Sequence, residues 1–364
     1  LDNNTMENPE AYTKAPAPPS QKKPGHIPQD QVEKFFREGY LIIEDFFKPE
    51  ELQPCRDACA GLVDELAQKL YKAGKIESLF DEYDVFHRLT EIEKVHPGAA
   101  ILLFKQGKMP QAFVDLWQNV TLLDMVEQFV GPDVSGHPVW NLRVKPPGNE
   151  YTTVPWHQDS AYFSEDSYDH MILIAWIPFL DTHEKNGGMQ VVKNAHKKGR
   201  VAMHNNCHAD TWFVNLPEEE MEKSLGAKFP DDVVTCRVPY GGMLLFNNIT
   251  PHRSLPNVTN DIRWSIDLRW QSPHHNWGFY DICEGVHFRS AKEGNLKPDW
   301  EKFFSVNRKE VWQKRHCKEV SKSSELKVLT TDPFDTTVTG PWIGRWPIVN
   351  HNRHTKAFQD MTAN

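Results

Sequence analysis

The sequence predicts a mainly β fold, a sandwich or a barrel-like jelly roll, with helices packed outside it. From Gly131 to about residue 290, short β-rich runs alternate with Gly, Pro and Asn turns, which is typical of such folds. Ahead of Gly131, apolar residues recur at helical spacing instead. The chain has 364 residues, 39% of them hydrophobic and 25% charged, so it is long enough to build a full hydrophobic core.

The first elements follow from local signals. Residues 1–27 carry several prolines without any periodicity, and we expect them to form a disordered leader. Asp30 or Gln31 then opens a short helix, which ends at Gly39. The apolar run Tyr40–Ile43 predicts a brief strand directly after it.

A longer amphipathic helix and the β region come next. The helix starts at Pro49, and helical patterns continue as far as Met125–Val130. The predicted strands of the β region are Val139–Val144, Met171–Phe179, Met189–Val192, Gly242–Phe246 and Ile262–Trp270. Residues 28–290 are therefore expected to form one domain, with helices outside a β core.

The last part of the chain, residues 291–364, is polar and irregular, with one helix-like stretch at Trp300–Val311. We expect it to be an extension that packs on the core. Its aromatic residues at Phe334 and Trp342–Trp346 would suit a lid over the mouth of a barrel. Docking to a partner or contacts in an oligomer are the alternative, since long ordered tails serve either purpose.

Composition limits the class of protein and its surroundings. The net charge of −9 argues against binding nucleic acid. The sequence contains no run of 18 apolar residues, so we expect no membrane span. The six cysteines are scattered without a Cys-x-x-Cys pair, which favours a reducing compartment. We therefore expect a cytoplasmic protein. A peroxisomal or other organellar location stays open, because the sequence does not begin with Met and an address could precede it.

The fragment Pro155-Trp-His-Gln-Asp159 carries the main chemical signal. On an extended segment, residues i and i+2 point to the same side, so His157 and Asp159 can reach one ion together. A lone His-x-Asp pair often occurs by chance. A second fragment strengthens the prediction, because a turn and a buried strand, Gly242–Phe246, lead to His252 at a loop. Two histidines and one carboxylate on one face of an ion are typical of non-haem iron oxygenases.

The run Ile262–Trp270 alternates strictly between apolar and polar residues. One face carries Ile, Trp and Leu, and the other carries Arg263, Ser265, Asp267 and Arg269. Buried charges must be paired or must meet a ligand, so this face is expected to line a polar cavity, where Asp267 and Arg269 could pair with each other. An arginine there is suited to gripping a carboxylate. The alternative is an edge strand whose polar face is solvated.

These residues together resemble the phytanoyl-CoA dioxygenase (PhyH) family. The resemblance covers about residues 29–277 and includes the segments QVEKFFREGYLIIEDFFKPEEL, WHQDSAYF, ILIAWIPFLD and NGGMQVVKNAHKKG. It implies a double-stranded β-helix, a cupin-like jelly roll closed by flanking helices. It also implies Fe(II) as the metal, 2-oxoglutarate as the cosubstrate and O2 as the oxidant.

The resemblance assigns roles to single residues. It implies His157, Asp159 and His252 as iron ligands and Arg263 as the partner of the distal carboxylate of 2-oxoglutarate. It places further cosubstrate contacts at Ser254 and Trp176. The remaining residues predicted to line the cavity and bind the cosubstrate are Asn141, Arg143 and Ser265.

The predicted function is hydroxylation of a small molecule, with release of succinate and carbon dioxide. The substrate could be an acyl-CoA ester or a small amino-acid-like or organic acid; the basic cluster His196, Lys197, Lys198 and Arg200 could hold a phosphate or could be a solvated loop. A cupin-like protein that binds a metal without catalysis is the alternative function. A scaffold protein with a decayed site is a further alternative. The presence of His157, Asp159, His252 and Arg263 argues against it. The oligomeric state stays open.

Overall fold

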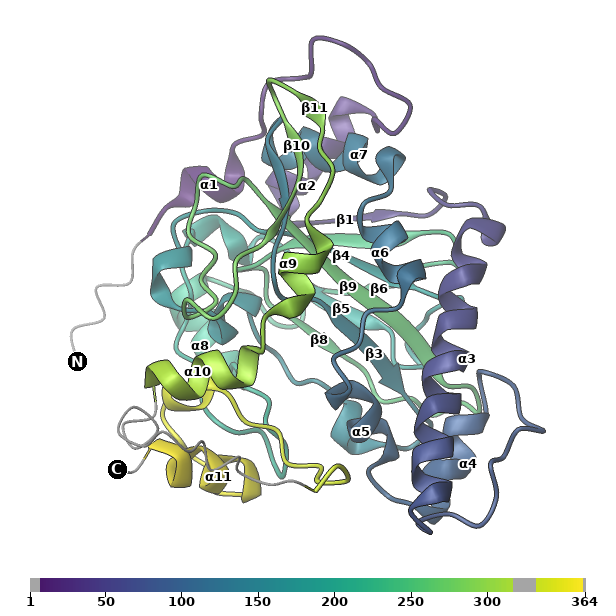
Figure 1. The fold of residues 1–364 in the computed structure, drawn as a ribbon. Coiled ribbons are helices and arrows are strands. Elements are labelled where there is room, and N and C mark those ends of the chain that lie inside the picture. The colour runs from purple at the N-terminus through teal and green to yellow at the C-terminus, as the bar shows by residue number, and fades with distance from the viewer. Residues whose placement is uncertain (1–6, 317–331, 363–364) are drawn as a thin grey trace.

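The computed structural model describes residues 7–316 and 332–362. Its centre consists of two antiparallel sheets, and helices lie against the outer side of the larger one (Figure 1). The larger sheet has the order β1-β7-β4-β9-β2-β10-β11, with β3 also paired to β9, and the smaller sheet has the order β6-β5-β8. This is the mainly β jelly roll that the sequence predicts.

The strands of the two sheets have these bounds: β1 Tyr40–Ile43, β2 Val134–Gly136, β3 Asn141–Lys145, β4 Leu173–Pro178, β5 Met189–Val192, β6 Val233–Cys236, β7 Met243–Asn247, β8 His252–Ser254, β9 Arg263–Gln271, β10 Val286–Ser290 and β11 Gly294–Asn295. All strand runs predicted from periodicity are present within one or two residues at each end. The apolar side chains of β4 and β7 meet those of β5 between the sheets, where Trp176, Val191 and Phe246 are buried.

The helices have these bounds: α1 Pro9–Thr13, α2 Gln29–Glu38, α3 Pro49–Lys72, α4 Arg88–Val95, α5 Ala99–Lys105, α6 Gln111–Trp117, α7 Val120–Val130, α8 Glu218–Glu220, α9 Trp300–Ser305, α10 Arg308–His316 and α11 Arg353–Thr362. The predicted end of α2 is confirmed, because Gly39 adopts a left-handed conformation with φ of 88°. Pro49 begins α3, and the Glu51 carboxylate accepts from the Lys48 amide at 2.8 Å. None of the described helices is long and apolar enough to cross a membrane.

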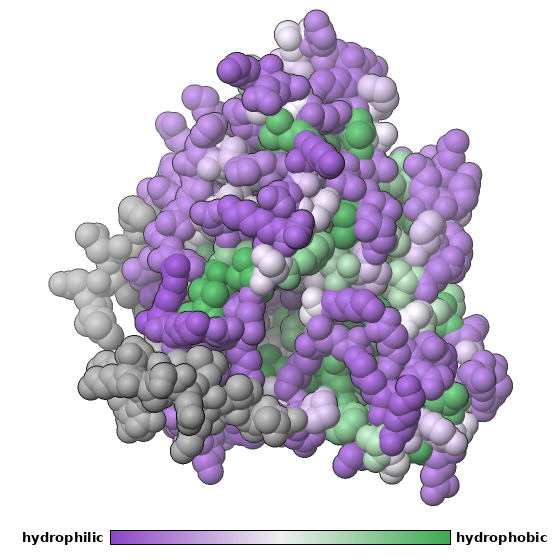
Figure 2. All heavy atoms as spheres, viewed as in Figure 1, coloured by the Kyte–Doolittle hydropathy of each residue, from purple (hydrophilic) through white to green (hydrophobic). Residues whose placement is uncertain are grey.

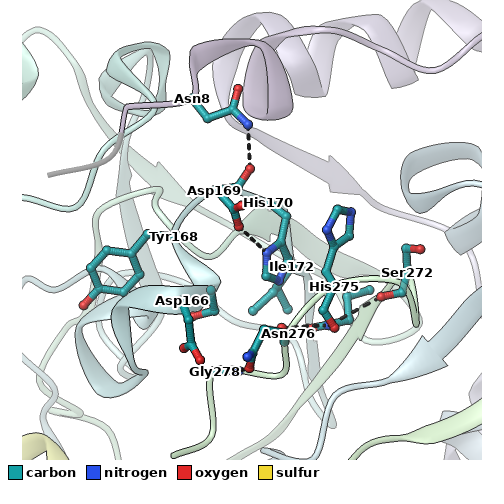
Figure 3. Close-up of polar contacts among 12 residues, drawn as sticks. Asn8, Asp166, Tyr168, Asp169, His170, Ile172, Ser272, His275, Asn276 and Gly278 are labelled. Atoms are coloured by element: carbon teal, nitrogen blue, oxygen red, sulfur yellow. Dashed lines mark hydrogen bonds and ion pairs between the residues drawn. The ribbon is translucent and has the colours of Figure 1, made fainter.

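The structure differs from the disordered leader that we predicted. Residues 7–27 are placed, and Tyr12 of α1 is fully buried against the segment that joins β3 to β4. The Tyr12 hydroxyl lies 2.9 Å from the Tyr168 carbonyl and 2.7 Å from the His170 carbonyl, so its one proton is shared between them, and its oxygen accepts from the Asn248 amide. Figure 3 shows the neighbouring contact, in which Asn8 donates to the Asp169 carbonyl. The composition of residues 7–27 could not show that they dock, because the residues that Tyr12 contacts lie more than 150 positions later in the chain. Residues 1–6 lie outside the described residues.

We expect Tyr12→Phe to lower the free energy of unfolding by about 1–3 kcal/mol, because the buried partners of the hydroxyl lose their hydrogen bonds. Urea unfolding followed by circular dichroism measures this difference. Tyr71→Phe is the matched control, since Tyr71 is 49% exposed. Equal stability of the two variants would show that the leader does not dock in solution.

The C-terminal region is more regular than expected. The stretch Trp300–Val311 is divided between α9 and α10, and α11 follows later in the chain. The segment between α10 and α11 contacts earlier parts of the chain. Its Trp346 indole donates to the carbonyl of Ala161, and its Trp342 and Ile343 carbonyls accept from the Asn206 amide. The segment thus contacts the two loop segments that carry Ala161 and Asn206. The boundary after residue 290 stays a prediction.

Candidate metal centre

Three acidic or imidazole side chains converge between the two sheets. One ligand atom from each of His157, Asp159 and His252 lies within 4.8 Å of the others, and among the described residues this is the one such group found. The Asp159 Oδ1 atom lies 3.4 Å from Nε2 of His157 and 3.5 Å from Nε2 of His252. All three side chains are buried. The sequence prediction that these residues come together is therefore confirmed geometrically.

Backbone pairing holds the two histidines in place. His157 and His252 exchange two main-chain hydrogen bonds of 3.0 and 2.9 Å, so an isolated bridge joins the loop before Asp159 to β8. Nδ1 of His157 donates to the Pro155 carbonyl, and Nδ1 of His252 donates to the Thr250 carbonyl. These bonds leave both Nε2 lone pairs facing the same point, and Nε2 of His157 has no partner.

Asp159 is held in place by Arg269, for which the sequence analysis had suggested Asp267 as a partner. Arg269 of β9 donates from Nε and Nη2 to Oδ2 of Asp159 at 3.0 and 2.7 Å. This leaves Oδ1 directed at the histidines. Burial raises the pKa of Asp159, but the Arg269 charge, followed by the contact with His157, outweighs it and holds the pKa well below its usual range.

The predicted pair of Asp267 with Arg269 is present, but it is the weaker contact of each residue. Their closest atoms are 3.9 Å apart, whereas Nε of Arg143 donates to Asp267 at 2.8 Å. Alternation correctly placed all these residues on the inner face of β9 or β3. Alternation could not show which carboxylate pairs with which arginine, because Asp159 belongs to a distant loop.

Arg263 lies in the cavity that the two histidines share. This cavity also has Arg143, Trp176, Ser254 and Asp267 in its lining. Among the described residues, Arg263 makes no ion pair: it donates to the Ser265 hydroxyl at 2.5 Å and lies 5.4 Å from the Trp176 ring centre. Its Nε is buried without a hydrogen-bond partner. Burial lowers the pKa of Arg263 to about 10, so it remains charged at neutral pH.

Lys145 is a polar residue of this cavity region that the sequence analysis missed. It follows Asn141 and Arg143 on the same face of β3 and pairs in register with Arg263. Its Nζ lies 2.8 Å from the Ser254 hydroxyl, 2.7 Å from the Leu255 carbonyl and 3.2 Å from the Thr153 hydroxyl. Burial, then the Arg263 and Arg143 charges, lowers the pKa of Lys145 well below its usual range. Its place in the alternation of β3 was the available signal.

The hydroxyl of Ser254 has a defined direction. It accepts from Nζ of Lys145 at 2.8 Å and from the Val154 amide at 3.0 Å. A hydroxyl oxygen offers two acceptor positions, and both are occupied. Its proton is therefore available to donate into the cavity, whose lining also includes Arg263.

The other predicted cavity residue, Asn141, lies on the Asp159 side. Its Oδ1 accepts from Arg269 at 3.1 Å and from Arg143 at 3.4 Å. Asn141 and Arg143 line a second cavity, which also contains Asp159. The polar cluster thus spans both cavities, and Arg143 borders each of them.

His204, His170 and His275 make contacts within the protein that do not involve the metal centre. His204 donates to the Ala202 carbonyl and accepts from the Gln158 amide. His170 stacks on His275 with ring centres 4.5 Å apart, and Nδ1 of His170 contacts the Asp169 carboxylate (Figure 3). No further group that could hold a metal is found among the described residues.

The basic cluster lies elsewhere. His196 is buried and hydrogen-bonds to the Phe36 carbonyl, and Arg200 pairs with Glu7 of the leader. Neither Lys197 nor Lys198 lines the two cavities at the metal centre.

Comparison with known proteins gives consistent relatives. The profile of the phytanoyl-CoA dioxygenase (PhyH) family matches residues 35–265. An ectoine dioxygenase of Nocardia farcinica is 24% identical over 260 residues, which cover 68% of this chain and 79% of the relative. A 1-deoxypentalenic acid 11-beta-hydroxylase of Streptomyces arenae is 29% identical over 175 residues, 45% of this chain and 59% of the relative.

Solved structures share the fold. The non-haem monooxygenase ThoJ aligns with a TM-score of 0.51 at 16% identity, covering 77% of this chain and 96% of its own. EctD from S. alaskensis, solved with 2-oxoglutarate and 5-hydroxyectoine, aligns with a TM-score of 0.50 at 17% identity, covering 81% of this chain and 93% of its own.

Proposed function

The chain belongs to the phytanoyl-CoA dioxygenase (PhyH) family and is a 2-oxoglutarate-dependent non-haem iron dioxygenase, and we propose that it hydroxylates a free small molecule rather than a coenzyme A thioester. In this proposal His157, Asp159 and His252 hold Fe(II), and Arg263 binds the distal carboxylate of 2-oxoglutarate. A cupin-like protein without catalysis is disfavoured, because the family match and both curated relatives are oxygenases.

The donor set fits Fe(II). Two imidazoles and one carboxylate oxygen on one face are the ligands of non-haem iron oxygenases and leave three positions open. Bound iron would supply the oxidising chemistry in which 2-oxoglutarate and O2 give succinate, CO2 and a hydroxylated substrate. The chain's own part is orientation. The Nδ1 bonds fix both imidazoles, and Arg269 leaves one oxygen of Asp159 for the ion.

The unpaired guanidinium of Arg263 is the observation that carries the cosubstrate assignment. A buried charge without a partner is costly, so the site is complete only when an anion is bound. Arg263 shares one cavity with His157 and His252. A dicarboxylate that reaches from the metal to Arg263 meets this requirement, and the Ser254 hydroxyl can donate to the same carboxylate.

Two features favour a free small molecule over a thioester of coenzyme A. The second cavity measures about 100 Å³, and a coenzyme A group would have to lie outside it. Among the described residues its lining has two cations, Arg143 and Arg269, each of which already pairs with one carboxylate, and neither Lys197 nor Lys198 lines it. The polyphosphate of coenzyme A would therefore lack a cluster of free cations at the cavity.

Anaerobic titration of the iron-loaded protein with 2-oxoglutarate tests the function. We expect the weak visible charge-transfer band of an Fe(II)–2-oxoglutarate chelate in the parent protein, and its loss in His252→Ala. Iron binding without a band at any 2-oxoglutarate concentration would contradict the cosubstrate assignment. Conversion of an acyl-CoA, with the free acid left unchanged, would contradict the proposed substrate form.

We expect Lys145→Met to weaken 2-oxoglutarate binding by about tenfold, because the Ser254 hydroxyl loses the donor that directs its proton into the cavity. The measurement is the same anaerobic titration, repeated with pyruvate, which lacks the distal carboxylate. Pyruvate binding should not change. Ser254→Ala and the double variant complete the test: if their effects on 2-oxoglutarate add, Lys145 does not act through Ser254.

A further inference from the structure

A second cavity adjoins the metal centre on the Asp159 side and is walled mostly by aromatic rings. Its apolar lining consists of Phe104, Val139, Tyr162, Phe163, Trp212, Phe213, Phe279 and Trp342. Its polar lining consists of Asn141, Arg143, Asp159 and Arg269. Because the cavity contains Asp159 but not Arg263, it can hold a second molecule while 2-oxoglutarate occupies the first cavity.

One wall comes from outside the part of the chain that matches the family. Trp342 belongs to the C-terminal segment, well beyond residue 265, where the match ends. Its ring packs edge-on against Tyr162, with centres 5.9 Å apart, and Tyr162 in turn packs against His157. The Trp342 indole donates to the Trp212 carbonyl at 3.2 Å. The C-terminal segment therefore closes the cavity and also holds the loop that carries Trp212.

The same loop borders both cavities. Trp212 and Phe213 line each of them, and Trp212 stacks on Phe104 of α5. His354 of α11 packs edge-on against Trp212 from the other side. A hollow on the surface between α5 and α9–α10 shares Phe104 and Asn141 with the second cavity, and apolar side chains gather there (Figure 2).

The polar groups at the inner end of the cavity offer donors. Oδ1 of Asn141 and Oδ2 of Asp159 both accept from Arg269, and Nε of Arg143 is taken by Asp267. The Tyr162 hydroxyl accepts from the Val214 amide, which leaves its proton to donate, and burial raises its pKa. Nη2 of Arg143 contacts Oδ1 of Asn141 at 3.4 Å, so Nη1 of Arg143, the amide nitrogen of Asn141 and the Tyr162 hydroxyl are the donors that the lining of the cavity offers.

We propose that the second cavity binds the substrate as a compact, mostly hydrocarbon carboxylic acid, with its carboxylate on Arg143, Asn141 and Tyr162 and its apolar body against Trp342. The proposal rests on the proposed function and specifies its substrate. Aromatic walls favour an apolar body, and a site that offers donors complements a group that only accepts. An ammonium group there would meet Arg143 without an acceptor of its own.

Three probes with the same body separate the substrate classes. We would use cyclopentanecarboxylate, cyclopentanemethanol and cyclopentanamine, and measure binding by anaerobic calorimetry to the protein loaded with Fe(II) and 2-oxoglutarate. We expect the carboxylate to bind at least about tenfold more tightly than the other two, as one charge-assisted contact requires. Equal affinities, or tighter binding of the amine, would overturn the proposed class.

Variants test each wall separately. Arg143→Met should bring the affinities of carboxylate and alcohol to within about twofold of each other, because the charge that separates them is gone. Trp342→Ala should weaken the carboxylate and the alcohol alike by about tenfold or more, and Trp342→Phe should retain most of the binding. Phe334→Ala is the control in the same segment, since Phe334 packs against His96 and lines neither cavity. Unchanged binding in Trp342→Ala would overturn the role of the C-terminal wall.

Failure of this proposal is distinguishable from failure of the proposed function. If the charge-transfer band forms with 2-oxoglutarate but the carboxylate probe does not bind, the dioxygenase stands and the substrate class is wrong. If the band does not form, the same probes are titrated into the metal-free protein. Preference for the carboxylate there, lost in Arg143→Met, would support the cavity assignment without the cosubstrate.

Discussion

Arg263→Met is expected to weaken 2-oxoglutarate binding by about thirtyfold or more while Fe(II) binding stays unchanged. Truncating one partner of a buried charge pair costs about 2–5 kcal/mol, and each 1.4 kcal/mol is tenfold in affinity. Arg263 touches none of the three residues that converge on the metal position. The charge-transfer band therefore should form only at much higher 2-oxoglutarate concentrations. Anaerobic titration of the two proteins side by side measures the difference.

The stability of Arg263→Met supplies a second, independent readout. In the absence of cosubstrate, Arg263 is a buried cation without an ion pair among the described residues, so its replacement by methionine removes a desolvation cost. We expect the cosubstrate-free variant to be at least as stable as the parent in urea. A clear loss of stability would show that Arg263 already has an anionic partner inside the protein, which contradicts its assigned role.

Arg269→Met is expected to have the opposite effect, a loss of about 3–5 kcal/mol in the stability of the metal-free protein, because it strands the buried Asp159 carboxylate without its cation. Fe(II) affinity should fall as well, since Asp159 would no longer be held with Oδ1 toward the histidines. Urea unfolding and Fe(II) titration measure the two effects.

Two further variants separate charge from geometry. Arg269→Lys keeps the charge but not the two-point contact, so we expect an intermediate loss of stability. Arg237→Met is the surface control, because the Arg237 side chain is 72% exposed and its pair with Glu184 should contribute little. If Arg269→Met and Arg237→Met were equally stable, the Arg269–Asp159 pair would not be a structural element.

Periodicity and motif spacing were enough for much of the fold and for the centre of the site. The alternation of Ile262–Trp270 identified β9 and its cavity face, and the buried run before His252 identified β7. These signals are local: a strand with one polar and one apolar face repeats every two residues. The approach of His157 to His252 followed from the jelly-roll arrangement that the strands predict.

Periodicity could not predict which side chains from distant segments contact one another. Asp159 and Arg269 come from a loop and a strand that only the folded chain brings together, and an alternating pattern says nothing about partners. Lys145 was overlooked because it lies one residue beyond the predicted strand Val139–Val144, next to Pro146. The docking of Tyr12 and the contribution of Trp342 to the second cavity likewise depend on surfaces formed elsewhere.

The two ends of the described chain meet at the segment that carries Asp159. Tyr12 near one end and Trp346 near the other belong to one buried cluster with Ala161, two residues after Asp159. Contacts of such long sequence separation form late in folding. On a ribosome, this segment would gain its support only after Trp346 had emerged, so iron is expected to load after that point. A version trimmed to residues 35–265 would keep all the proposed ligands and yet lose the cluster that steadies one of them.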